Sequence, residues 1–162
     1  MNDLKLHRVA SAYRLDDRII IHANTQTVAG FYVNRDPFIM LDARASVGEI
    51  GHAILRAFDA AQFDAPIPIA ADLKPLTQRR LKAAGVKSER QLQMRAVHCL
   101  VTRTANEIAI MPTHNGGTRG DERGFHFRVE QVIVIALNSS PAQIGAAVLD
   151  GFARCTSVFA EV

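Results

Sequence analysis

Two stretches of this chain share a similar pattern of apolar residues. They lie 94 positions apart, with Gly30 at the start of the first and Gly124 at the start of the second. Each stretch holds a strand-like apolar run, followed by a segment with apolar residues at i, i+3 and i+4 spacing. The stretches cover residues 30–60 and 124–154, and they align without a gap. Matches at one constant offset over about thirty residues indicate an internal repeat. We therefore predict two structural halves within one domain.

The periodic segment of each stretch predicts an amphipathic helix. The first runs from Val47 to about Phe58, and the second from Pro141 to Phe152. Ser46 and Glu49 fit a capping box at the first start, and Ser140 and Gln143 fit one at the second. The same local signals thus begin both helices.

A glycine lies inside each predicted helix, Gly51 in the first and Gly145 in the second. Glycine in a helix interior costs about 1 kcal/mol relative to alanine. The same cost at matching positions predicts that the helix backbone closely approaches a strand or the twin helix.

Strand-like runs precede each helix. In the first half they are residues 4–13, 18–22, 31–33 and 38–41, with a polar connection at 24–29 and a loop at 34–37. In the second half they are 94–103, 107–111, the stretch that starts at Gly124-Phe125, and 132–135, so that each half has four strands before its helix. Tight turns between consecutive strands imply antiparallel pairing. We predict an α+β fold: an antiparallel β-sheet with helices packed on one face, built from two β-rich halves that each end in a helix and are related by a pseudo-two-fold. The pattern leaves open whether the halves share one sheet or form two.

The length of 162 residues suits a single domain covering 1–162. We place its halves at about 1–62 and 92–157, with a basic helical connection at about 63–91. In this connection a helix is predicted from Lys74 to Ala84, ended by Gly85, and a short turn is predicted after Ser88.

Positive charge is concentrated in the middle of the chain. The net charge is +3, and the segment 74–95 has seven basic residues and only one acidic one, Glu89. This pattern is typical of a solvated helix face whose Leu73, Leu76, Leu81 and Ala84 point to the core. The alternative is a phosphate-binding surface, which would make the chain a nucleic-acid-binding accessory protein.

No catalytic, cofactor or metal motif is found in the sequence. The six histidines lack helical ligand spacing, CxxC and HExxH are absent, and Asn115-Gly116-Gly117 lacks the spacing of a phosphate loop. Two cysteines are too few for a disulfide framework. On a strand, His98 and Cys99 would point to opposite faces, which predicts a buried thiol beside a surface imidazole. We expect a protein that is not an enzyme, without cofactor, metal or small-molecule substrate.

The chain also lacks an apolar run long enough to span a membrane and an apolar secretory signal after Met1. We therefore expect a cytoplasmic protein that does not contact membranes.

The combined pattern resembles a known family. It joins a Gly-Phe strand, a Ser-x-x-[Glu/Gln]-Ile-Gly-x-Ala-x-Leu-x-x-Phe helix, a basic middle with Gly85-Val86-Lys87-Ser88, and the segment Ile108–Pro112. In these features the chain, from about Arg18 to Cys155, is similar to the CdiI-type immunity proteins of bacterial contact-dependent growth inhibition. The resemblance implies a non-enzymatic protein that binds and neutralises the C-terminal toxin domain, a nuclease, of its cognate CdiA. Because immunity proteins against such toxins are often acidic, it also implies either an acidic patch on one face or an acidic toxin surface.

Specific recognition usually resides in loops on a rigid scaffold. The connection Pro112–Arg123 is longer than its counterpart in the first half, and it carries charges of both signs. We predict that it contributes to toxin binding, with Asp121 and Glu122 as anchors for a basic nuclease. The candidate residues are His114, Asn115, Arg119, Asp121, Glu122 and Arg123.

Overall fold

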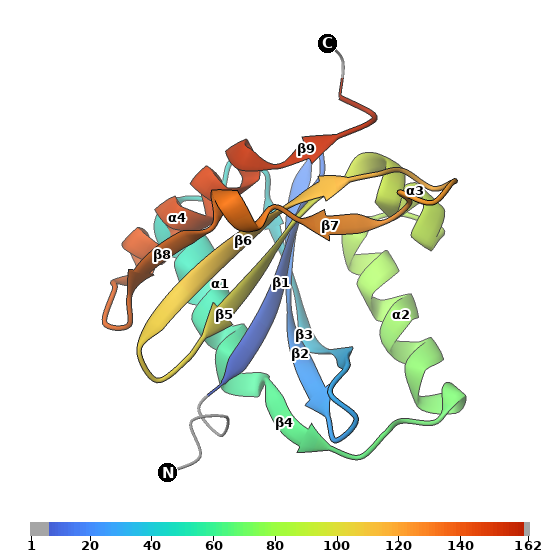
Figure 1. The fold of residues 1–162 in the computed structure, drawn as a ribbon, viewed down its shortest axis with the longest axis horizontal. Helices are drawn as coiled ribbons and strands as arrows, with labels where there is room; N and C mark the ends of the chain where they lie inside the picture. Colours follow the sequence, from blue (N-terminus) through green and yellow to red (C-terminus); the bar gives the residue numbers. More distant parts are fainter. Residues whose placement is uncertain (1–6, 161–162) are drawn as a thin grey trace.

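A computed structural model describes residues 7–160 of the chain (Figure 1). The strands are β1 (Arg8–Arg14), β2 (Arg18–Thr27), β3 (Tyr32–Asp42), β4 (Gln62–Ala65), β5 (Val97–Arg103), β6 (Glu107–Asn115), β7 (Phe125–Phe127), β8 (Ile133–Ala136) and β9 (Thr156–Ser157). The helices are α1 (Val47–Ala60), α2 (Ala70–Ala84), α3 (Glu89–Arg95) and α4 (Pro141–Arg154), together with the 3-10 turn η2 (Val129–Gln131).

All the strands belong to one sheet. Its path is β3-β2-β1-β5-β6-β7, while β4 pairs with β2, and β8 and β9 pair with β6. The pairing is antiparallel except for the short strands β4 and β9, which are parallel to their partners. The prediction of an α+β fold with a large antiparallel sheet is confirmed. Because β1 pairs with β5 over seven residues, the two halves share this sheet.

Helices cover both faces of the sheet, although the sequence predicted helices on one face (Figure 1). Alternate residues of the strands, such as Ile19 and Ile21, pack with α1 and α4 in the larger core. Their neighbours, such as Ile20, pack with the end of α2 and with α3 in a smaller core. The sequence placed Leu81 and Ala84 of the basic connection toward the core, and both pack in this second core. It did not predict that this core lies on the opposite face of the sheet from α1 and α4.

The contact between α1 and α4 confirms the reason given for the two glycines. A Cβ on Gly51 would clash with the backbone of Pro141, and a Cβ on Gly145 would clash with the backbone of Val47. An offset of 94 positions converts Gly51 into Gly145 and Val47 into Pro141. Each helix therefore makes the same contact with the other: its glycine lies on the first residue of its partner. Both predicted capping boxes are formed, at Ser46 and at Ser140. That the complete halves superimpose stays a prediction.

Several boundaries differ from the predicted ones. Residues 24–27, predicted as a connection, continue β2, and residues 34–37, predicted as a loop, lie inside β3. The reason is pairing: both parts of β3 bond to β2, and a register shift after His22 leaves Asp36 and Pro37 as a bulge. The first half therefore has three strands before its helix. The predicted strand residues 4–6 lie outside the described part of the chain.

The boundaries in the middle of the chain also differ from the predicted ones. Helix α2 starts at Ala70, because the carboxylate of Asp72 accepts the N–H of Ile69. Gly85 ends it in the left-handed conformation, as predicted. Of the four residues expected to face the core, Ala84 is buried, whereas Leu73 is 37% exposed. Only the last turns of α2 pack closely. Residues 94 and 95, predicted as strand, belong to α3.

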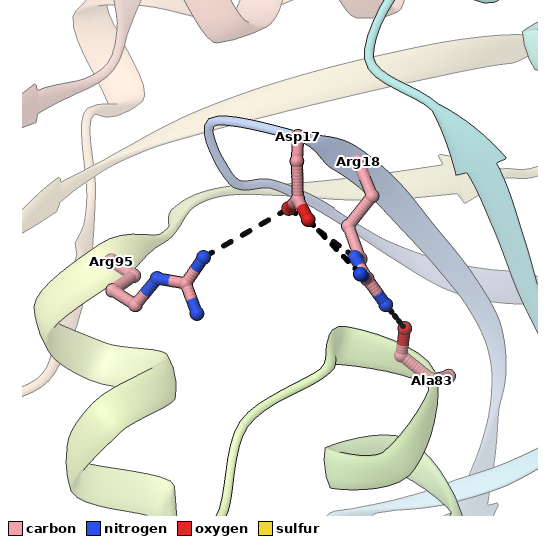
Figure 2. A network of polar contacts seen from close by, with 4 residues as sticks. All are labelled: Asp17, Arg18, Ala83 and Arg95. Atoms are coloured by element: carbon pink, nitrogen blue, oxygen red, sulfur yellow. Dashed lines mark hydrogen bonds and ion pairs between the residues drawn. The ribbon is translucent and has the colours of Figure 1, made fainter.

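A polar network holds α2 and α3 against the sheet (Figure 2). The guanidinium of Arg18 donates two hydrogen bonds to the carboxylate of Asp17 and one to the carbonyl oxygen of Ala83, the last at 3.2 Å. Arg95 of α3 lies 3.9 Å from the same carboxylate. The turn between β1 and β2 is thereby joined to both helices of the second face.

His98 is buried rather than exposed, which corrects the expected surface imidazole. Its ring centroid lies 4.6 Å from that of Tyr13 and 5.2 Å from that of Phe125. His22 and Phe38 extend this row across the sheet. The opposite orientation of Cys99 was predicted correctly, since its thiol lies in the larger core.

Candidate functional site

The connection between β6 and β7 is a closed hairpin loop. The N–H of Gly116 donates to the carbonyl oxygen of Gly124 at 2.8 Å, and the N–H of Gly124 donates to that of Gly117 at 2.9 Å. Gly117, Gly120 and Gly124 have φ values between 83° and 95°, which favour glycine. The predicted interface loop therefore has a defined shape.

Asn115 fastens this loop to the scaffold. Its side-chain amide donates to the carbonyl oxygens of Gln93 and Ala96, and its Oδ1 accepts from the N–H of Gly117 at 3.0 Å. The residue is 1% exposed. It therefore positions the loop from below, and its side chain is not available to a partner.

The structure separates the six candidate residues into two groups. Arg119, Asp121, Glu122 and Arg123 are exposed together on the loop. His114 and Asn115 instead belong to β6, beyond the strand end that was predicted. The ring Nδ1 of His114 lies 2.7 Å from the hydroxyl of Thr156 in β9, so this residue connects two strands.

Apolar side chains that were not predicted lie beside the loop. Val158 and Phe159 follow β9, and they are 57% and 41% exposed. Their side chains pack against Gly117, where an added Cβ would lie 3.1 Å from Val158. Phe127, in the strand that leaves the loop, is 56% exposed. Little in the sequence indicated this apolar surface, because the short segment after α4 has no periodic pattern of apolar residues.

Several basic side chains of the segment 74–95 are already paired with carboxylates of the same chain. Arg79 forms an ion pair with Asp36 at 2.7 Å, Arg80 pairs with Glu89, and Arg95 approaches Asp17. Arg80 is also largely covered, with a side chain 11% exposed. Three of the seven cations therefore hold α2 and α3 in place, which weakens the interpretation of this segment as a nucleic-acid surface.

An open groove of about 640 Å³ lies between the sheet, β4 and α2. Its lining includes three carboxylates, from Asp36, Asp59 and Asp72, and one cation, from Arg35. Because Asp36 also pairs with Arg79, the groove is only mildly acidic. It does supply an acidic region on a chain that is basic overall.

Among residues 7–160, no group of three or more histidine, cysteine, aspartate or glutamate side chains is arranged to hold a metal ion. Within the same range, no helix is sufficiently long and apolar to cross a membrane.

Comparison with protein families gives the decisive observation. The model of the family described as CdiI, the CDI immunity proteins, matches residues 69–155, more than half of the chain. The chain belongs to the CdiI family. It is thus an immunity protein of contact-dependent growth inhibition, and the resemblance noted in the sequence is confirmed. No curated protein matches the chain.

Two solved structures share the CdiI fold seen here. One is a protein of unknown function, NMB0488 from Neisseria meningitidis, with a TM-score of 0.74 and 14% identity over 96% of this chain and 99% of that one. The other comes from a CdiA-CT/CdiI toxin and immunity complex of Yersinia pseudotuberculosis, with a TM-score of 0.72 and 16% identity over 93% of this chain and 98% of that one. At such identities the likeness concerns the fold.

Proposed function

We propose that this CdiI protein binds the C-terminal toxin domain of a cognate CdiA and thereby protects the cell that produces both. The observation that carries the proposal is membership of the immunity family, joined by a similar fold in a toxin and immunity complex. The role requires binding and no catalysis. It acts inside the producing cell, where the toxin domain would otherwise reach its target.

The hairpin loop between β6 and β7 is the surface we assign to toxin recognition. Four charged side chains project from a backbone closed by its own hydrogen bonds and by Asn115. A loop held in this way loses little conformational entropy on binding, so more of the contact energy appears as affinity. Charges of both signs favour docking against a complementary pattern and reject other toxins.

The toxin is proposed to be a nuclease, whose phosphate-binding surface is basic. Asp121 and Glu122 are then the anchors, because they are the exposed carboxylates of the loop. The alternative role of residues 74–95 in nucleic-acid binding has less support, since three of its cations are already paired.

The test measures binding of the purified chain to the CdiA toxin domain encoded beside it. The wild type should form a stable complex that suppresses the nuclease activity of the domain. Replacing Arg119, Asp121 and Glu122 with Ala should weaken the affinity more than about tenfold, or about 1.4 kcal/mol. A dissociation constant within about threefold of wild type would place the interface elsewhere.

A matched control removes the same charges far from the loop. Arg56 and Asp59 are exposed on α1, and Glu107 is exposed at the opposite end of β6. Their triple replacement with Ala changes the net charge equally and should leave the affinity within about threefold of wild type. Equal losses in both variants would indicate long-range attraction without a specific loop contact.

A further inference from the structure

The two cysteines of the chain meet in the larger core. Cys99 lies on β5, and Cys155 directly follows α4. They are 56 positions apart in sequence, yet their Sγ atoms lie 3.7 Å apart. The fold therefore brings two thiols that are distant in sequence into contact.

The surroundings of this pair leave room for the sulfur atoms to approach each other. Both lie at the last turn of α4, next to Gly151; a Cβ on that glycine would lie 3.1 Å from the sulfur of Cys99. Glycine thus leaves free the space that another residue would fill.

The two thiols differ in access and in acidity. Cys99 is fully buried, whereas Cys155 is only partly buried and is the more accessible of the two residues. The S–H of Cys99 stabilises the thiolate of Cys155, and the Arg128 guanidinium adds to this, so the pKa of Cys155 is lowered below its ordinary value. The same interaction, together with burial, raises the pKa of Cys99. Cys155 is therefore suited to attack and Cys99 to resolve the product.

We propose that Cys99 and Cys155 form an oxidisable pair, which small disulfides such as glutathione disulfide convert into an intramolecular disulfide. In the first step the Cys155 thiolate attacks the glutathione disulfide, forms a mixed disulfide and releases one glutathione thiolate. In the second step the Cys99 sulfur attacks the Cys155 sulfur, and its proton passes to the departing second glutathione. Two protein thiols are oxidised, and one glutathione disulfide is reduced to two glutathione molecules.

The position of the bond connects it with the loop surface. Cys155 immediately precedes β9, which pairs with His114 and Asn115 at the base of the hairpin loop. Val158 and Phe159 come next and pack against Gly117. A disulfide to β5 would anchor the start of this segment covalently. The inference itself concerns the thiols and does not depend on toxin binding.

The test incubates the reduced full-length chain with glutathione disulfide and follows free thiols and intact mass. We expect both thiols to disappear, with a loss in mass of two hydrogen atoms and a peptide joining Cys99 to Cys155. Because the bond closes a long loop, the thermal midpoint should rise by about 5–10 °C. A wild-type chain that keeps a glutathione adduct, or that retains both thiols, would overturn the proposal.

Two variants separate the steps. Cys99→Ser should stop at a glutathione adduct on Cys155, and Cys155→Ser should remain unmodified because its remaining thiol is buried. An adduct on Cys99 in Cys155→Ser would contradict the assigned order of attack. Should either variant fail to fold, the cross-linked peptide from the wild type decides the matter alone.

Discussion

At the scale of single residues, Gly51 and Gly145 show how a locally unfavourable choice serves packing. Each lowers helix propensity, and each lets its helix lie directly on the first turn of the other. In both cases a side chain would meet backbone atoms, which cannot rotate away. The exchange of these contacts between the two copies explains why both copies keep the glycine.

The first prediction concerns Gly145→Ala. Helix propensity alone would stabilise this variant by about 1 kcal/mol, but the new Cβ clashes with the backbone of Val47. We expect the free energy of unfolding to fall by about 2–3 kcal/mol in urea denaturation. Gly48→Ala is the control on the twin helix, since an added Cβ there would meet only the Ser46 hydroxyl, at 3.9 Å. The control should match or slightly exceed wild type; an equal fall in both variants would contradict the explanation.

At the scale of elements, the loop between β6 and β7 depends on strand residues more than on its own sequence. Asn115 closes β6, holds α3 through the carbonyl oxygen of Gln93 and orients Gly117. The positions of the four charged residues that we assign to toxin recognition thus depend on the buried side-chain amide of Asn115. This arrangement separates the residues that contact a partner from the residue that positions them.

Asn115→Ala tests this dependence. The N–H of Gly117 loses its acceptor and the carbonyl oxygens of Gln93 and Ala96 lose a donor, so the loop should open locally. Hydrogen exchange should be at least about tenfold faster at the Gly117 amide, a change of roughly 1.4 kcal/mol in local opening. The amide of Ala10 in the central strand pair serves as the reference and should change much less. Unchanged exchange at Gly117 would mean that the backbone bonds alone maintain the loop.

At the scale of the whole molecule, an aromatic row joins the strands across the second face of the sheet. It contains Phe38, His22, Tyr13, His98 and Phe125, from five different strands. Burial lowers the pKa of His22 to about 4 and that of His98 to about 3, and the nearby Arg80 adds to both effects. The folded chain therefore holds two neutral histidines where the unfolded chain would bind protons.

Acid should consequently destabilise the fold. Each histidine binds its proton near pH 6.5 in the unfolded chain and only near pH 4 (His22) or pH 3 (His98) in the folded chain. Below about pH 6.5 the unfolded chain therefore binds more protons than the folded chain, and the free energy of unfolding falls. At pH 5 each should reduce the free energy of unfolding by about 2 kcal/mol. His98→Phe keeps an aromatic ring and should remove about half of this loss, as measured by urea denaturation between pH 5 and pH 7.

His52→Gln is the matched control, because this histidine is exposed on α1. The variant should follow the pH dependence of the wild type. If His98→Phe also followed it, the buried imidazoles would not be the source of the acid sensitivity.

The sequence by itself determined what depends on neighbours along the chain. Capping boxes, helical periodicity and the left-handed Gly85 are local, so α1, α4 and the end of α2 were predicted within a few residues. The glycines at matching positions of the two copies also predicted a close contact of the helix backbone. The resemblance to the CdiI family was drawn from these local signals, and the match of the family model confirms it.

Only the tertiary structure decided what depends on partners distant in sequence. Residues 34–37 look like a loop, but they are strand because β2 pairs on both sides of them. His98 looks like a surface residue beside a buried thiol, but α2 and α3 cover the second face. Asn115 looks like a binding residue, yet it is buried beneath the loop. Cross-strand pairing, burial and the meeting of Cys99 with Cys155 all join positions that no local pattern connects.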